Sequence, residues 1–428
     1  MNILLKNNHL KTKLKTLTTL CLFTVAVSTP FSTIAKTLAI TNATVHTVTD
    51  LGVLENATVL VTDGLISAIN PESFNADEEY DAQGKNLTPG FIGALNPIGL
   101  IEVNAVSNSV DVEEEKADIT FDTSSAFNPK STLIPYARQG GITSNLVIPH
   151  GGKGMFRGQA FFANLSGEFT SNTVSNKAVV LDLGGKSEGS RSTAINTLIQ
   201  TLEDAQEALS DKKSATKDKK DSKEKAPKRD EKVVNQLLDG TIPVVIYADR
   251  ATDILAAINI KKRFNLDVIL VGASDAILII EQLKVANIPV MIDPKKNLPE
   301  SFDSLNSSLN NTKILIDAGI KTIIIQEDAH KLNQLRYSAG NAISYGVTKE
   351  QALASVTANV ADVFKLNRGR IAVGKQADLV LWSADPFELS TKVDKLWIEG
   401  EVMNMNSRQD ALRDRYLSES TLPKAYIK

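Results

Sequence analysis

The sequence predicts an α/β protein in which a (β/α)₈ TIM-type barrel is joined to a small β-sandwich domain built from both chain ends. Three observations lead to this expectation. Runs of β-branched residues alternate with amphipathic helical stretches in the middle of the chain, as in a parallel sheet or barrel covered by helices. Both chain ends instead consist of short strand-like runs separated by turn sequences. The middle region, at roughly 280 residues, has the size of a (β/α)₈ barrel.

The first 35 residues have the pattern of a signal peptide. Four lysines precede an apolar run from Thr19 to Val27, and Thr33 and Ala35 supply small residues for cleavage. The run is much shorter than the ~20 residues of a membrane span, although an uncleaved anchor is the alternative. Cys21, the only cysteine, lies inside this run, so the mature chain would have no thiol. We therefore expect a periplasmic or secreted protein without disulfides or a membrane span.

The sandwich is expected to form from residues 36–88 and 369–428, the latter including a C-terminal tail. Residues 37–70 alternate apolar with polar side chains and are broken by D-L-G and D-G, which favours hairpins. The same texture returns in residues 369–387 and 393–401.

The barrel is expected to occupy residues 89–368. Its strand-like runs are residues 242–249, 267–273, 288–293 and 321–328, and residues 253–264 and 275–286 separate them as helices. Residues 211–232 carry ten basic and six acidic side chains and no large apolar one, so we expect a disordered, charged insertion there. Docking of this segment to an anionic lipid or envelope polymer is the alternative. The net charge of −3 argues against nucleic acid as a partner.

Three motifs resemble the amidohydrolase superfamily. P-G-F-I (89–92) is similar to the end of that family's first barrel strand, and A-L-A-S-V-T-A-N-V-A-D-V-F-K-L (352–366) to its last helix, before which Thr348 and Gln351 form a capping box. G-R-I-A-V-G-K-Q-A-D-L-V-L-W (369–382) resembles the motif where the chain leaves the barrel. Residues 242–254 and 268–276 are similar to the imidazolonepropionase-like branch in particular. The resemblance implies hydrolysis of non-peptide, cyclic C–N bonds by a metal-bound water.

Most residues that match the family's metal ligands are not ligands here, and only the acid of the eighth strand has candidates, Glu327 or Asp328. Gly93, Leu95 and Pro97 take the places of an Asp and two His, while Tyr247 and Gly272 take those of two further His. The whole chain has four histidines, of which His9 falls in the signal peptide and His46 outside the barrel, leaving His150 and His330. We therefore expect no catalytic metal and no other cofactor.

Polar residues at the ends of the strand-like runs are the remaining candidates for chemistry, because active sites of barrels lie where the strands end. A histidine beside carboxylates can act as a general base without a metal, which makes the catalytic candidates Glu327, Asp328 and His330. The substrate-binding candidates are Tyr247, Arg250, His150 and Asn96. For each, a structural role is the alternative: turn formation, loop anchoring or filling of the space that a ligand and metal leave.

Two functions stay open. The first is an exported hydrolase of cyclic C–N bonds that is metal-independent or has become inactive. The second is a non-catalytic pseudoenzyme that serves as a periplasmic binding or interaction module. Either would take a small-molecule substrate or ligand, and the family resemblance adds a possible homodimer.

Overall fold

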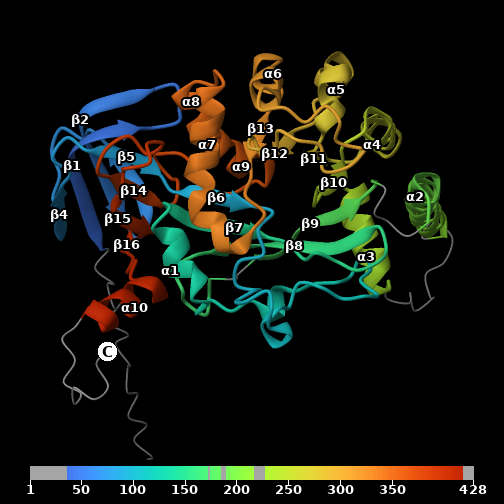
Figure 1. Ribbon diagram of the computed structural model, residues 1–428, viewed down its shortest axis with the longest axis horizontal. Helices are drawn as coiled ribbons and strands as arrows, with labels where there is room; N and C mark the ends of the chain where they lie inside the picture. Colours follow the sequence, from blue (N-terminus) through green and yellow to red (C-terminus); the bar gives the residue numbers. More distant parts are fainter. Residues whose placement is uncertain (1–35, 172–173, 185–188, 216–226, 418–428) are drawn as a thin grey trace, which may run out of the picture. The chain divides into compact units, whose positions relative to one another are not determined.

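The computed structural model describes residues 36–171, 174–184, 189–215 and 227–417, which form one compact unit (Figure 1). The expected signal peptide lies outside these residues, as do residues 216–226 of the expected insertion. Within the described part of the chain, every helix is too short or too polar to span a membrane.

The sheet domain is built from both chain ends, as predicted. Its strands are hydrogen-bonded in the order β16-β15-β14-β5-β1-β2-β3, and β4 also pairs with β1. The seam between the two chain ends is the antiparallel pair β5–β14, which sets Pro89 opposite Leu379. The strands are β1 (Thr37–His46), β2 (Val53–Thr62), β3 (Leu65–Ile69), β4 (Glu78–Asp81), β5 (Asn86–Pro89), β14 (Leu379–Trp382), β15 (Val393–Ile398) and β16 (Glu401–Val402).

The predicted D-G turn links β2 to β3. Asp63 and Gly64 both have positive φ angles, 49° and 77°, which matches the tight hairpin turn that Asp-Gly favours. Gly64 is further required by packing, because a Cβ there would lie 2.7 Å from the carbonyl oxygen of Glu399.

The barrel is a second eight-stranded sheet, in the order β13-β12-β11-β10-β9-β8-β7-β6. One strand departs from the expected parallel arrangement: β8 runs antiparallel to both β7 and β9. The loops before and after β8 are too short for the crossover that parallel neighbours need. The strands are β6 (Phe91–Ala94), β7 (Ile142–Val147), β8 (Phe156–Asn164), β9 (Val174–Asp182), β10 (Val244–Ala248), β11 (Val268–Gly272), β12 (Val290–Ile292) and β13 (Thr322–Ile324).

The barrel is nearly closed. No ladder joins β13 to β6 in the described residues, and single hydrogen bonds bridge the gap instead. From the end of β6, the Asn96 side chain donates to the Gln326 carbonyl just after β13 over 2.6 Å. The Ile92 amide on β6 donates instead to the Val356 carbonyl, between α8 and α9, over 2.8 Å.

Helices cover the outer face of the barrel and link its strands (Figure 1). The α-helices are α1 (Leu133–Arg138), α2 (Arg191–Ala215), α3 (Arg229–Leu238), α4 (Ala251–Phe264), α5 (Ile280–Ala286), α6 (Asn311–Asp317), α7 (Leu335–Ser344), α8 (Lys349–Ser355), α9 (Ala358–Val363) and α10 (Arg408–Leu417). The 3₁₀ helices are η1 (Ser107–Ser109), η2 (Ser124–Ala126), η3 (Ser274–Leu278) and η4 (Ala329–Gln334). The two ends of the expected insertion thus belong to helices, residues 211–215 to α2 and 229–232 to α3.

Two expected helices are each divided in the structure. Residues 275–286 form η3 and then α5, because 3₁₀ bonds such as Ile279 N–H to Ala276 C=O tighten the first part. Residues 352–366 form parts of α8 and α9, which Thr357 separates with a non-helical φ of −137° and ψ of −90°. The break falls where the Val356 carbonyl accepts the bond from β6. The capping box of Thr348 and Gln351 is present, as predicted.

Candidate functional site

The interior of the barrel is a packed apolar core. Side chains from all eight strands and from α9 fill it, with Leu95, Val245, Met291, Ile325 and Phe364 among them, all less than 4% exposed. Tyr247 packs against this core near the end of β10, on the side of the barrel where the strands end. Because the interior is filled, polar chemistry is confined to the mouth, where the strands end.

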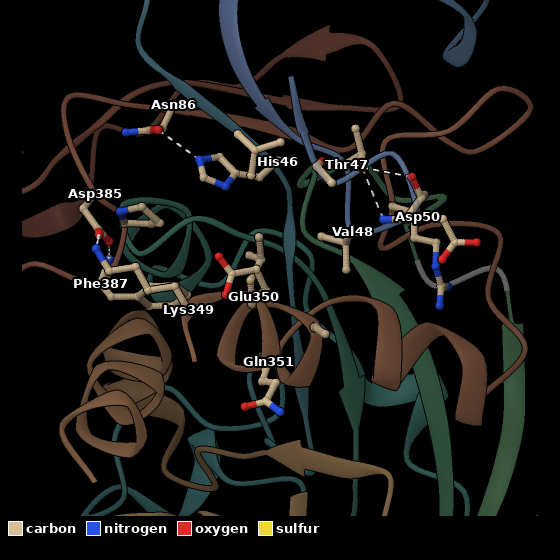
Figure 2. Close-up of a pocket in the computed structure, with 17 residues that line it drawn as sticks. His46, Thr47, Val48, Asp50, Asn86, Lys349, Glu350, Gln351, Asp385 and Phe387 are labelled. Atoms are coloured by element: carbon tan, nitrogen blue, oxygen red, sulfur yellow. Dashed lines mark hydrogen bonds and ion pairs between the residues drawn. The ribbon is translucent and has the colours of Figure 1, made fainter. Parts of the chain in front are cut away.

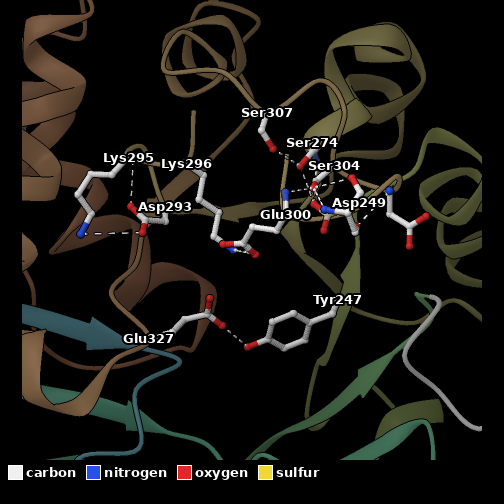
Figure 3. A network of polar contacts seen from close by, with 12 residues as sticks. Tyr247, Asp249, Ser274, Asp293, Lys295, Lys296, Glu300, Ser304, Ser307 and Glu327 are labelled. Atoms are coloured by element: carbon white, nitrogen blue, oxygen red, sulfur yellow. Dashed lines mark hydrogen bonds and ion pairs between the residues drawn. The ribbon is translucent and has the colours of Figure 1, made fainter. Parts of the chain in front are cut away.

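Four side chains at the mouth form two linked polar pairs. The Tyr247 hydroxyl donates to Glu327 Oε1 over 2.7 Å (Figure 3). Arg157 Nη2 donates to Asp182 Oδ2 over 2.8 Å, and its guanidinium lies 3.7 Å from the centroid of the Tyr247 ring. This close stacking is a favourable cation–π contact that ties the two pairs together. We refer to Arg157, Asp182, Tyr247 and Glu327 as the mouth network.

Burial and charge fix the protonation states in the mouth network. Burial and the neighbouring Glu327 carboxylate raise the pKa of Tyr247 well above 10, although Arg157 opposes this shift. Tyr247 is therefore a neutral donor. Burial acts against the charge on Lys296, but Glu327, Glu300 and Asp249 raise its pKa, so a second cation stands close to Glu327.

The space left at the mouth is small. A cavity of ≈ 50 Å³ lies beside Tyr247 and Glu327, with Asp249, Asp293 and Lys296 also in its lining. A water molecule occupies about 30 Å³ of liquid volume, so the cavity has room for one or two waters. It is too small for the cyclic amide or lactone that the family resemblance suggested.

Of the three expected catalytic residues, the structure brings Asp328 and His330 close together, with His330 Nδ1 3.7 Å from Asp328 Oδ1. Glu327 belongs to the mouth network, whereas Asp328 accepts a hydrogen bond from the His330 amide over 2.9 Å and pairs with Lys331 at 3.0 Å. The other ring nitrogen of His330, Nε2, donates to the Glu102 carbonyl over 3.0 Å. Partial burial opposes ionisation of Asp328, but Lys331 and the His330 amide lower its pKa overall. Asp328 is thus placed as the cap of η4.

The expected substrate-binding residues lie in different surroundings. Tyr247 is part of the mouth network, while Asn96 is fully buried and holds β6 against the segment after β13. Arg250 is 44% exposed in its side chain and lies 4.0 Å from Asp303. Burial and the charge of Arg157 lower the pKa of His150, which therefore stays neutral near the mouth.

At four of the five positions that the family resemblance sets against metal ligands, the side chain carries no nitrogen or oxygen, and Tyr247 is the exception. Leu95 and Pro97 carry only carbon in their side chains. A Cβ at Gly93 would lie 2.4 Å from Asn145 Oδ1, and one at Gly272 would lie 2.5 Å from Asp249 Oδ1. Within the part of the chain that the structure describes, no three His, Cys, Asp or Glu side chains come close enough to hold a metal ion.

Sequence reasoning missed Arg157, Asp182 and Lys296. Arg157 lies near the start of β8, a strand that the barrel pattern did not predict. Because β8 runs antiparallel to its neighbours, its first residues lie at the mouth, where the parallel strands end. One signal was present: the run M-F-R-G-Q-A-F-F (155–162) holds a single charge among apolar residues, which is typical of a buried, paired cation.

The fold and its mouth define a class: an amidohydrolase-type barrel joined to a sheet domain that both chain ends build. The sequence model of the amidohydrolase family matches residues 217–403 of this chain. The amidohydrolase tasK of Hapsidospora irregularis is 23% identical over 385 residues, which are 80% of this chain but 39% of that protein. This chain therefore spans about two fifths of the length of that curated relative.

Solved structures show the same fold. An amidohydrolase from Thermotoga maritima superposes with a TM-score of 0.77 at 24% identity, covering 85% of this chain and 99% of that one. An adenosine deaminase from Xanthomonas campestris with bound zinc gives 0.51 at 16% identity, covering 89% and 99%. The chain is therefore similar to the amidohydrolase family in sequence over residues 217–403, and it shares the fold of solved amidohydrolases over most of its length.

Proposed function

We propose that this protein is an exported, non-hydrolytic member of the amidohydrolase superfamily that acts as a binding or interaction module. The observation that carries the proposal is the occupied barrel mouth. The mouth network lies where a hydrolase of this family would bind its substrate, and the cavity beside it has only ≈ 50 Å³.

The residues at the mouth do not fit a divalent metal ion. Zinc needs three or four nitrogen, sulfur or carboxylate donors at about 2.0–2.3 Å. Leu95 and Pro97 have none, Gly272 has no side chain, and the hydroxyl of Tyr247 is a neutral donor engaged with Glu327. A cation placed beside Tyr247 would also be repelled by the guanidinium that stacks on its ring.

The protein instead supplies its own cations. Asp182 and Glu327 are partly buried carboxylates, and such groups are costly without a counter-charge. Arg157 pairs with Asp182 at 2.8 Å, and the Lys296 ammonium is attracted by Glu327. We infer that these two cations took over the charge balance that a metal provides in hydrolytic relatives.

Metal content and turnover test this proposal. Protein purified without chelator and assayed by elemental analysis should hold far less than one zinc per chain. A panel of cyclic amides, lactones and blocked dipeptides should show no turnover above buffer, with or without added zinc. Stoichiometric zinc would overturn the proposal.

The competing function, a metal-independent hydrolase, predicts a different result. It requires chelator-insensitive turnover that falls in Glu327→Gln and stays unchanged in Glu281→Gln. Glu281 is the matched control because it is an exposed glutamate on α5 that lines neither the mouth cavity nor the larger cavity of the protein. Turnover with this pattern would replace the binding role with a catalytic one.

Export is part of the proposal and rests on the pattern of residues 1–35. The compact unit begins at Lys36, next to the expected cleavage after Ala35. Mature protein recovered from a cell-envelope fraction should therefore begin at Lys36 on N-terminal sequencing. An intact N-terminus would contradict cleavage. Pairing into a homodimer stays a prediction from the family resemblance, and light scattering tests it.

A further inference from the structure

A second cavity, much larger than that at the mouth, lies where the sheet domain meets the barrel. It has a volume of ≈ 550 Å³, against ≈ 50 Å³ at the mouth. Its walls are the end of β1 with the following loop, β5, α8 and the segment 385–387 (Figure 2). We call it the junction groove. Small-molecule sites have volumes of about 300–1,000 Å³ and often lie between domains, so its size and place suit a ligand.

The floor of the junction groove is apolar and rigid. Phe387 stacks on Phe91 of β6, with ring centroids 6.2 Å apart and planes within 10° of parallel. Leu353, on α8, is 4% exposed and belongs to the same core. These side chains would contact the apolar part of a ligand without having to reorganise.

The loop above the floor is held in an unfavourable conformation. Val48 has a φ of +56°, which β-branched residues rarely adopt. The Thr47 hydroxyl maintains the turn through a 2.7 Å hydrogen bond to the Gly52 carbonyl. Val48 points from this loop into the junction groove (Figure 2). Backbone strain of this kind is concentrated at ligand sites, where it presents a side chain that a relaxed turn would not.

The two cations of the junction groove are already neutralised. Lys349 forms an ion pair with Asp385. Arg370 donates to both carboxylate oxygens of Asp362, over 2.6 and 2.9 Å. Neither is available to attract an anion.

Two carboxylates at the junction groove have no such partner. Glu350 on α8 and Asp50 in the loop are exposed, and within the described residues neither forms a hydrogen bond or ion pair to another side chain. Glu350 does help to raise the pKa of the adjacent Lys349, whose main partner is Asp385. The unbalanced charge of the groove is therefore negative and favours a cation.

His46 adds a directed acceptor. Its Nε2 lies 2.9 Å from Asn86 Oδ1, and because an amide oxygen only accepts, Nε2 carries the proton. The other ring nitrogen, Nδ1, is then a hydrogen-bond acceptor. His46 and Glu350 come from opposite walls of the junction groove (Figure 2). A primary ammonium group, with three donors, matches this pair of acceptors.

We propose that the junction groove binds a small organic cation: a primary amine carried on an apolar body. The ammonium lies between His46 and Glu350, and the apolar body rests on Leu353 and Phe387. This inference rests on the proposed binding role and gives it a site and a ligand class.

Three probes of similar size and shape test the ligand class on the full mature chain by isothermal titration calorimetry. These are 2-phenylethylamine, 2-phenylethanol and phenylacetate. We expect the amine to bind more tightly than the alcohol and the anion to bind least. The preference should shrink as salt is raised from 20 to about 500 mM, because screening weakens exposed charge pairs. Equal binding of amine and alcohol, or tighter binding of the anion, would overturn the proposal.

Two variants locate the site by independent routes. Glu350→Gln removes one charge at constant shape and should weaken amine binding about threefold to fivefold, while leaving the alcohol unaffected. Ala354→Phe fills the junction groove from α8 and should abolish binding of all three probes. Glu281→Gln is the matched control and should change nothing. Amine binding that both groove variants leave intact would place the ligand elsewhere and refute the site.

The outcomes also separate this inference from the proposed function. If the wild-type protein shows no preference for the amine, no zinc and no turnover, only the amine site in the junction groove is refuted. Stoichiometric zinc with turnover, alongside selective amine binding, would refute the non-hydrolytic function and leave the groove as a ligand site.

Discussion

Removing the Arg157 guanidinium should destabilise the barrel strongly, because Arg157→Gln would leave Asp182 without its ion-pair partner. The two side chains are only 21% and 12% exposed, and breaking one partner of a buried pair costs about 3–5 kcal/mol. Arg157 retains some solvent contact, which lowers this cost, whereas loss of the stacking on Tyr247 adds about 0.5–2 kcal/mol. We expect a loss of about 3 kcal/mol in the free energy of unfolding.

Guanidinium unfolding followed by circular dichroism measures this loss. Arg263→Gln is the matched control, because Arg263 pairs with Glu203 on the surface with side chains 52% and 39% exposed, and such pairs contribute about 0–1 kcal/mol. Asp182→Asn in the Arg157→Gln background should recover about half of the loss, since no unpaired charge then remains. The reasoning is refuted if Arg157→Gln costs no more than Arg263→Gln, or if the double variant is as unstable as the sum of the single ones.

Three further outcomes are expected. Burial opposes ionisation of Asp362, but Arg370 and a lysine lower its pKa overall. The ionised carboxylate therefore stabilises the fold fully above the unfolded pKa of about 3.9, and this stabilisation is lost as the pH falls through the lower folded pKa. Asp362→Asn should make the melting temperature less dependent on pH between about pH 5 and 2, and an unchanged pH dependence in thermal melts would contradict this. Gly272→Ala should destabilise the protein more than Gly240→Ala. Both glycines have a positive φ, 83° and 73°, but only a Cβ at Gly272 would collide with a neighbouring atom. Equal melting temperatures of the two variants would contradict this reasoning. Asn96→Ala removes the bridge between the two unpaired barrel strands and should cost about 1–3 kcal/mol, with hydrogen exchange of the β6 amides rising; unaltered exchange would show that the bridge does not close the barrel.

The fold could be predicted from the sequence because its signals are local. The Asp63–Gly64 turn, the capping box of Thr348 and Gln351, and the alternating strand and helix patterns each depend on a few neighbouring residues. The family motifs then fixed the order of barrel and sheet domain. What the local signals did not contain was the break at Thr357, because that break depends on a hydrogen bond from Ile92, more than 250 positions away.

The candidate site was predicted only in part. Tyr247 and Glu327, both chosen for their position at strand ends, lie together in the structure, joined by a 2.7 Å hydrogen bond. The same criterion grouped Asp328 and His330 with them. These two side chains lie 3.7 Å apart at the start of η4, where Asp328 pairs with Lys331 and His330 donates to a backbone carbonyl. Adjacent residues can direct their side chains to different neighbours, and the spacing of residues in the sequence does not show which neighbour each one contacts.

The sequence by itself determined the class of fold, the residues that stand where the family has metal ligands, and the charges that must be balanced. Only the tertiary structure decided how they are balanced. Arg157 meets Tyr247 and Asp182 because β8 runs antiparallel between two parallel neighbours. His46 meets Glu350 in one groove because both chain ends fold into one sheet beside the barrel. Backbone preferences act over a few residues, whereas charge pairing and cavity formation depend on which distant segments pack together.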